Sequence, residues 1–133
     1  MIGILLITHG TFGESLVQNV SHILGARPAL IGQLGVLAQD NPPALLPQAR
    51  AALKEVDDGA GVLIMTDMLG ASPSRLATEL LEPGRIEGVA GLNLPMLLRA
   101  LTYRQQKMAV LVQKTLSGGR EGVINMHRQT PDN

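Results

Sequence analysis

The sequence predicts a single α/β domain built on a doubly wound, mainly parallel sheet with helices on both faces. Short apolar or β-branched runs alternate with segments in which apolar residues recur at helical spacing. The connections are short and rich in glycine, proline and asparagine. Such alternation implies right-handed crossovers between parallel strands. Because the chain has 133 residues and contains no linker, low-complexity segment or internal repeat, we expect residues 1–133 to form one domain.

The first part of the chain predicts two strands with a helix between them. Ile2–Thr8 is a run of β-branched residues and leucine, typical of a strand that is buried on both faces. The helix that follows has a capping-box pattern, Thr11 with Glu14 three residues later, and Gly25 is placed to end it. Leu30–Leu37 predicts the second strand, which is diluted by glycine.

In the middle of the chain, helices and a strand are again predicted to alternate. Asn41 and Pro42 open a second helix, which must begin late enough to place Pro47 in its first turn. Gly61–Thr66 predicts the third strand, which ends at an aspartate. Ser72-Pro73 has the pattern of a helix N-cap followed by the first helical residue, so a third helix is expected to begin here.

Two more helices and a fourth strand are expected in the remainder. Pro83-Gly84 ends the third helix, and Ile86–Leu92 predicts the fourth strand. Asn93 and Pro95 start a fourth helix. Apolar residues from Met108 to Thr115 predict one more helix.

The C-terminal residues 119–133 are expected to form a strand and a tail. Ser117–Gly119 ("SGG") should break the last helix, which leaves Val123–Met126 as an isolated strand candidate. An open sheet edge invites pairing with another chain, and a terminal strand behind a glycine hinge can exchange between protomers. We therefore expect a homodimer in which Gly122–Met126 lies along the partner's sheet. The alternative is a monomer that folds this strand onto its own edge.

Composition narrows the classes of function. Eleven Lys and Arg residues balance eleven Asp and Glu residues, so the charge does not favour nucleic acid or an anionic membrane. One Phe, one Tyr and no Trp leave no platform for stacking bases or sugars. The absence of cysteine excludes disulfides and thiolate nucleophiles. Since the chain also lacks the basic segment of a signal peptide and the ~20 apolar residues of a membrane span, we expect a soluble cytoplasmic protein.

Two titratable residues stand where parallel sheets bind their ligands. His9 ends the first predicted strand, and Asp67 ends the third. Ligands of such sheets bind beyond the carboxyl ends of the strands, where the strand order reverses. If the strand order is 2-1-3-4, the two side chains face one crevice, and the helix amides behind Gly10 could hold an anion. The pair is the candidate site.

Other kinds of site lack support in the sequence. His22 lies outside the apolar face of its helix and His127 lies in a polar tail, so both are expected to be solvated and no metal site is predicted. Neither G-x-G-x-x-G nor a Walker-type motif is present, which argues against a dinucleotide or ATP site. A hydrolase triad of Ser72, His9 and Asp67 would need a G-x-S-x-G elbow, and Ser72 is better explained as a helix cap.

Four motifs carry a resemblance that covers nearly the whole chain. "THG" follows the first strand, "TDMLGASPS" the third, "VAGLNLPML" spans the fourth, and "GGREGV" stands near the end. Together they resemble the mannose-type IIA domain of the bacterial phosphoenolpyruvate:sugar phosphotransferase system. The resemblance implies that His9 accepts a phosphoryl group from the histidine-containing phosphocarrier protein and passes it to a IIB component. It also implies a dimer with a swapped antiparallel strand, and contact with the membrane only through IIC and IID subunits.

The resemblance assigns roles to further residues. It places the phosphoryl group on Nε2 of His9 and Asp67 beside the ring, where a carboxylate would select the tautomer. Backbone amides at Gly10 and Thr11, together with the Ser72 hydroxyl, would hold the phosphoryl group. No metal or other cofactor is needed, because the donor is already a phosphohistidine. Met68 and Leu69 replace aromatic residues of the better-known transporters, which leaves partner recognition open.

Three alternatives remain at this point. The protein could be a regulatory phosphoprotein whose phosphorylation state is read by a partner. It could be the phosphotransfer subunit of a dihydroxyacetone kinase, although the "GREGV" ending argues against this. A binding module without phosphorylation would require His9 to be inert.

Overall fold

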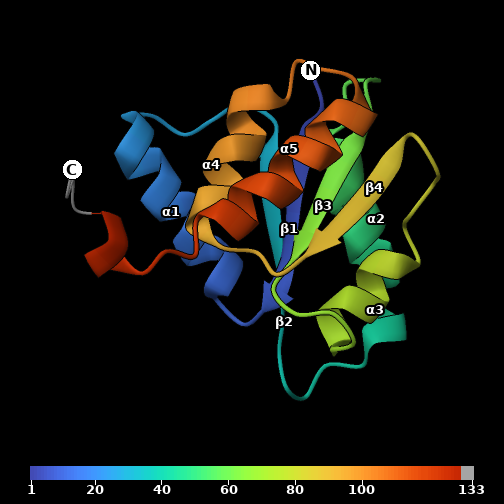
Figure 1. Ribbon diagram of the computed structural model, residues 1–133. Coiled ribbons are helices and arrows are strands. Elements are labelled where there is room, and N and C mark those ends of the chain that lie inside the picture. Colours follow the sequence, from blue (N-terminus) through green and yellow to red (C-terminus); the bar gives the residue numbers. More distant parts are fainter. Residues whose placement is uncertain (130–133) are drawn as a thin grey trace.

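The computed structural model describes residues 1–129 and contains a four-stranded sheet in the order β2-β1-β3-β4 (Figure 1). All three strand pairs are parallel. The strands are β1 (Gly3–His9), β2 (Ile31–Val36), β3 (Val62–Thr66) and β4 (Ile86–Ala90). The predicted fold class and strand order are therefore confirmed, with β1 and β3 as the two central strands.

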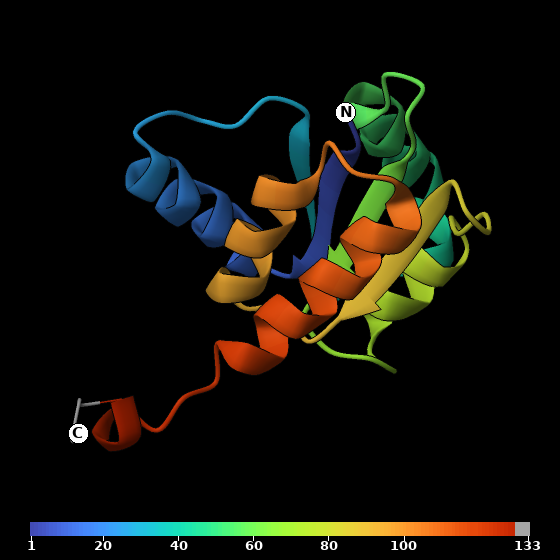
Figure 2. The same cartoon turned by 45° about the horizontal axis from the view of Figure 1, so that its top comes forward.

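Helices cover both faces of the sheet, as Figures 1 and 2 show. One face carries α1 (Phe12–Leu24), α4 (Leu94–Tyr103) and α5 (Met108–Glu121), and the other carries α2 (Leu46–Val56) and α3 (Ser72–Thr78). A 3₁₀ turn, η1 (Pro42–Leu45), precedes α2, and a second, η2 (Met126–Gln129), follows α5. Among residues 1–129, no helix is long and apolar enough to cross a bilayer.

The core is divided by the sheet into two aliphatic layers. Along β1, Ile4 and Leu6 pack toward α1, α4 and α5, whereas Leu5 and Ile7 pack toward α2 and α3. All four side chains are inaccessible to solvent. A central parallel strand buried on both faces requires such a continuous apolar run, which is why the sequence pattern located it.

Helix starts agree with the predictions only in part. The α2 helix begins at Leu46, so Pro47 lies in its first turn as required, and the Asn93 side chain caps α4 by accepting from the Met96 N–H. Thr11 occupies the N-cap of α1 but makes no capping hydrogen bond. Ser72 is the first residue of α3 and not its cap, which is Ala71.

The predicted break at Ser117–Gly119 is wrong, because α5 continues to Glu121. The two glycines of this segment allow close packing: a Cβ on Gly118 would lie 2.5 Å from the Arg99 Cβ, and one on Gly119 would lie 2.6 Å from the Met96 Cε. They let α5 lie directly against α4.

The predicted C-terminal strand is absent from the described chain. Residues 123–125 are irregular and lead into η2, and Figure 2 shows this segment running away from the sheet. The exchange of this segment with a partner chain stays a prediction. Residues 130–133 of the predicted tail lie outside the described residues.

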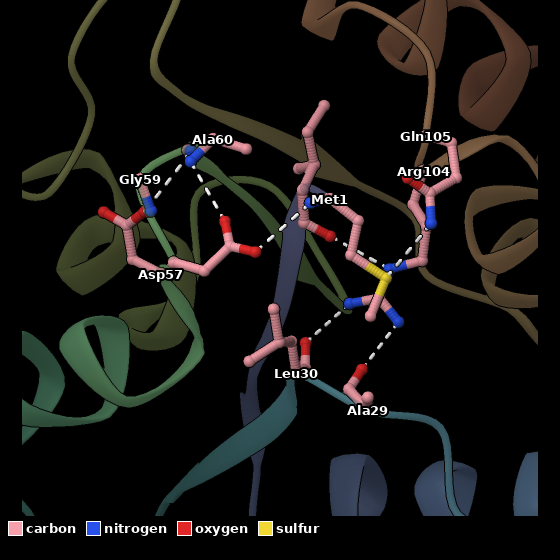
Figure 3. Close-up of polar contacts among 11 residues, drawn as sticks. Met1, Ala29, Leu30, Asp57, Gly59, Ala60, Arg104 and Gln105 are labelled. Carbon is pink, nitrogen blue, oxygen red and sulfur yellow. Dashed lines mark hydrogen bonds and ion pairs between the residues drawn. The ribbon is translucent and has the colours of Figure 1, made fainter.

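The amino-terminal end of the sheet is closed by Arg104 (Figure 3). This side chain is buried and donates to three backbone carbonyls, those of Ile2 (2.9 Å), Ala29 (2.6 Å) and Leu30 (2.7 Å). The connection between α1 and β2 is thereby tied to the start of β1. At the opposite end of the sheet, His9, the last residue of β1, is exposed.

Candidate functional site

His9 and Asp67 meet at the carboxyl end of the sheet. His9 is the last residue of β1, and Asp67 directly follows β3, which pairs with β1. Oδ2 of Asp67 lies 2.8 Å from His9 Nδ1 and also accepts the His9 backbone N–H at 3.0 Å. The imidazole is 52% exposed and the carboxylate 17% exposed. The carboxylate therefore holds both the ring and the backbone of His9, and the ring still reaches solvent.

The electrostatics of the pair select one tautomer of His9. Burial raises the pKa of the Asp67 carboxyl, but the hydrogen bonds from the His9 backbone and ring, and the charge of that ring, lower it below its ordinary value. Asp67 is thus ionised at neutral pH and can only accept hydrogen bonds. In a neutral imidazole the proton then resides on Nδ1, which leaves a lone pair on Nε2. Nucleophilic chemistry at Nε2 follows from this arrangement.

The turn after His9 depends on two glycines, Gly10 and Gly35, of which the sequence analysis did not single out Gly35. Gly10 has a left-handed backbone, with φ of 49°, and its N–H donates to the Val36 carbonyl at 2.9 Å. A Cβ on Gly35 would lie 2.1 Å from the Gly10 oxygen. Gly35 is therefore needed for β2 to approach this turn. Its signal in the sequence is a glycine inside a strand, which often marks a close backbone approach.

The first turn of α1 presents free amides close to His9 in the chain. Gly10 does not supply one, because its N–H is bonded to β2. The Gly13 N–H donates to the Thr8 hydroxyl at 2.8 Å. Within the described chain, the N–H groups of Thr11, Phe12 and Glu14 have no partner. Unpaired amides at a helix N-terminus, where the helix dipole is positive, favour an anion.

The loop from β3 to α3 is held internally. Asp67 Oδ1 accepts the Met68 N–H at 3.1 Å. The Ser74 hydroxyl accepts the Gly70 N–H at 2.8 Å and donates to the Ala71 carbonyl. Ser72, the serine predicted to bind a phosphoryl group, is half-buried and its hydroxyl has no partner in residues 1–129. Ser74, which the sequence analysis missed, therefore shapes the loop, and Ser72 keeps a free hydroxyl.

Exposed apolar side chains surround this end of the sheet. Phe12 follows β1, Leu37 follows β2, and Met68 and Leu69 follow β3. We call these four residues the apolar rim; Leu69 is the most accessible of them, at 79%. Apolar side chains gathered around a polar centre are typical of a surface that contacts another protein.

The other two histidines lie elsewhere. His22 is exposed on the last turn of α1, and His127 is exposed in η2. Neither joins His9, and within residues 1–129 no group of three or more His, Cys, Asp or Glu side chains could hold a metal ion.

Comparison with known proteins identifies the family. The family model described as "PTS system fructose IIA component" matches residues 3–115. The mannose-specific EIIAB component of the phosphotransferase system of Escherichia coli K12 is 31% identical over 125 residues, which cover 92% of this chain and 38% of that protein. The fructose-specific EIIA component of Bacillus subtilis 168 is 29% identical over 79% of this chain and 72% of its own length.

The fold agrees with this relationship. A crystal structure of phosphotransferase system component EIIA from Streptococcus agalactiae superimposes with a TM-score of 0.83 at 25% identity, covering 96% of this chain and 99% of that chain. The chain spans well under half the length of the E. coli relative. The family match over most of the domain, together with the shared fold, shows that the chain belongs to the family of the PTS system fructose IIA component.

Proposed function

We propose that the protein is a phosphohistidine relay that accepts a phosphoryl group on His9 and passes it on. The donor is the phosphohistidine of the histidine-containing phosphocarrier protein, and the acceptor is a IIB component. One observation carries this assignment: Asp67 binds Nδ1 of His9, while the half-exposed ring keeps Nε2 available. Membership of the IIA family supports the same reaction class.

The bonds that form and break in the transfer involve only the two imidazoles and the phosphoryl group. The lone pair on His9 Nε2 attacks phosphorus, the N–P bond of the donor breaks, and its electron pair remains on the donor ring. The His9 ring gains positive charge as the new N–P bond forms, and the ionised Asp67 stabilises that charge through Nδ1–H. In the second step the acceptor attacks the same phosphorus, and the electron pair returns to Nε2.

The phosphoryl oxygens require hydrogen-bond donors that are already in place. We assign this role to the unpaired amides of Thr11 and Phe12 and to the free hydroxyl of Ser72. Gly10, which the sequence analysis included, serves by its left-handed turn, since its N–H is bonded to Val36. These donors form a cradle for a dianion without a metal ion.

Both partners must reach the same nitrogen, so they must use the same surface in turn. The apolar rim supports docking of the phosphocarrier and of the IIB component at this surface. The relay would operate in the cytoplasm, with contact to the membrane only through IIC and IID subunits. The relay would not bind nucleic acid.

The decisive experiment is phosphorylation from phosphoenolpyruvate through enzyme I and the phosphocarrier. The wild-type chain should acquire one phosphate that is labile to acid and stable to base. The variant His9→Ala should acquire none, whereas His22→Ala, which removes an exposed histidine of α1, should match the wild type. Phosphate that still appears on His9→Ala would overturn the assignment.

A homodimer belongs to the same proposal. Val123 and Met126 are 80% and 86% exposed beyond the end of α5, and a segment with such side chains can gain stability by pairing with a second copy. Light scattering should show a dimer for the full chain and a monomer for a chain ending at Gly122, which retains all of α5. A full-length monomer at micromolar concentration would rule out the exchange.

A further inference from the structure

We propose that Thr8 is a positioning residue of the His9 relay. Its hydroxyl fixes the first turn of α1 on β1, so that the amides of Thr11 and Phe12 keep their place beside the phosphoryl group. This inference rests on the proposed function and adds to it a residue that does not touch the reacting atoms.

The key contact is a buried hydrogen bond between strand and helix. Thr8 is inaccessible to solvent and directly precedes His9 in β1. Its Oγ1 accepts the N–H of Gly13, the second residue of α1, at 2.8 Å. Because both groups are buried, removing the hydroxyl would leave the Gly13 N–H without a partner, which is unfavourable.

Two further features show that this contact replaces an ordinary helix cap. Thr11 stands at the N-cap of α1, yet its side chain makes no capping bond. A Cβ on Gly13 would lie 3.0 Å from Thr8 Oγ1 and 3.4 Å from the Leu6 Cβ, so the helix backbone rests directly on the strand. The cap of α1 is therefore supplied by the strand that ends in the nucleophile.

The arrangement divides the amides of the first turn into two sets. The Gly13 N–H is bonded to Thr8 inside the domain, while the N–H groups of Thr11, Phe12 and Glu14 remain unpaired within the described chain. If α1 shifted on β1, the second set would move relative to His9. Misplacement of a positioned group by about 1 Å is enough to slow a transfer strongly.

The neighbouring strand provides a matched control. Thr66 directly precedes Asp67 as Thr8 precedes His9, and the two strands pair in parallel. Thr66 is also buried, at 3% exposure, but its Oγ1 has no hydrogen-bond partner among the described residues. Valine has nearly the shape of threonine but lacks the hydroxyl. The substitution removes a buried hydroxyl at either position, but only at Thr8 does it break a hydrogen bond to α1.

The test compares single-turnover transfer from the phosphorylated carrier to wild type, Thr8→Val, Thr8→Ser and Thr66→Val. We expect Thr8→Val to lower the saturated rate about tenfold or more, with no change in the carrier concentration for half-maximal rate. Thr8→Ser keeps the acceptor oxygen and should restore most of the rate. Thr66→Val should match the wild type. A wild-type rate in Thr8→Val, or an equal loss in Thr66→Val, would overturn the inference.

Amide hydrogen exchange tests the same contact in the wild-type chain, even where Thr8→Val does not fold. The Gly13 amide should be protected, whereas the amides of Thr11 and Phe12 should exchange quickly and shift on phosphorylation. Rapid exchange at Gly13 would contradict the inference. His9→Ala separates the two claims: phosphate on that variant refutes the relay itself, whereas an inert His9→Ala beside a fully active Thr8→Val refutes only the role of Thr8.

Discussion

Both ends of the sheet carry polar groups, but these groups are paired at the amino-terminal end and partly unpaired at the carboxyl end. At the amino-terminal end, Arg104 is buried and gives its donors to backbone carbonyls (Figure 3). At the carboxyl end, the His9 ring is half-exposed, and amides of α1 lack partners within the described chain. The closed end contributes stability, and the open end leaves hydrogen-bonding groups unpaired within the described residues.

Asp57 and Asp67 show the same difference between two parts of the molecule. Asp57 accepts the N–H groups of Gly59 and Gly61 and pairs with Arg85. Asp67 likewise accepts backbone N–H groups and pairs with His9. Each carboxylate holds a loop and a basic side chain, but a guanidinium cannot release its proton, whereas an imidazole can offer a lone pair. The chemistry differs because of the partner and not because of the carboxylate.

The largest change in stability should come from the closed end. Arg104→Met removes a donor from three backbone carbonyls, of which that of Ile2 lies in a buried contact, and should lower the free energy of unfolding by about 2–4 kcal/mol. The folded fraction should still accept phosphate at the wild-type rate. Arg50→Met, at an exposed position of α2, should change the stability by no more than about 0.5 kcal/mol. Urea unfolding of both variants measures the difference, and equal effects would break the comparison.

Asp67→Asn should have the opposite effect to Arg104→Met: it should slow transfer and leave the fold stable. An amide can donate to the ring and favour the tautomer with the proton on Nε2, so transfer should slow about 10- to 100-fold while the fold remains stable. The matched variant is Asp57→Asn, which alters the other carboxylate and should transfer at the wild-type rate. Single-turnover phosphorylation distinguishes them. A wild-type rate in Asp67→Asn would show that the carboxylate does not select the tautomer.

The titration of Asp67 tests the electrostatic side of the pair. Its pKa should lie below the ordinary value of 3.8 and rise in His9→Ala, which loses the ring but keeps the backbone N–H. Since the folded-state pKa is lowered, the ionised carboxylate stabilises the fold fully above about pH 3.8, and this contribution is lost as the pH falls through the lower folded-state value.

Carbon NMR of the carboxyl groups measures this titration and contains its own control. Asp58 also has a lowered pKa, caused first by the Ala60 N–H and then by the N-terminal amine, and it lies at the closed end. His9→Ala should leave the Asp58 titration unchanged. Movement of both carboxyl groups, or of neither, would contradict the pairing of Asp67 with the ring.

The apolar rim should affect binding more than chemistry. Leu69→Ser should raise the carrier concentration for half-maximal transfer by a factor of about 3–10 and leave the saturated rate unchanged. Ile23→Ser alters another exposed apolar residue, near the end of α1 away from His9, and should have no effect. A lowered saturated rate in Leu69→Ser would instead assign the residue to the transfer step.

The smallest effect is expected at Thr11. Replacing a capping residue by alanine usually costs about 1 kcal/mol, but Thr11 makes no capping bond, so Thr11→Ala should cost less than about 0.5 kcal/mol. Asn93→Ala should cost the usual amount or more, because Asn93 caps α4 and also donates to the Gly119 carbonyl of α5. Thermal unfolding of the two variants is the measurement.

Local pattern predicted the four strands of the sheet and placed His9 and Asp67 at the carboxyl ends of β1 and β3. Continuous apolar runs predicted β1 and β3, and parallel strands place their carboxyl ends at one edge of the sheet. The strand order 2-1-3-4, which the sequence analysis assumed, brings His9 at the end of β1 together with Asp67 after β3. Family motifs then indicated the chemistry. The strands needed only the order of residues along the chain and the period of their apolar positions, whereas the pairing of β1 with β3 was decided by the fold.

Contacts between backbones that are distant in sequence were decided by the tertiary structure alone. A capping-box pattern pointed to Thr11, but α1 rests so closely on β1 that Thr8 caps it. A glycine pair predicted a helix break, but Gly118 and Gly119 provide room for α4. Glycine favours both turns and close approach, and a buried hydroxyl binds whichever amide packing brings to it. Sequence pattern cannot choose between such outcomes, because the choice depends on a neighbouring element that only the folded chain supplies.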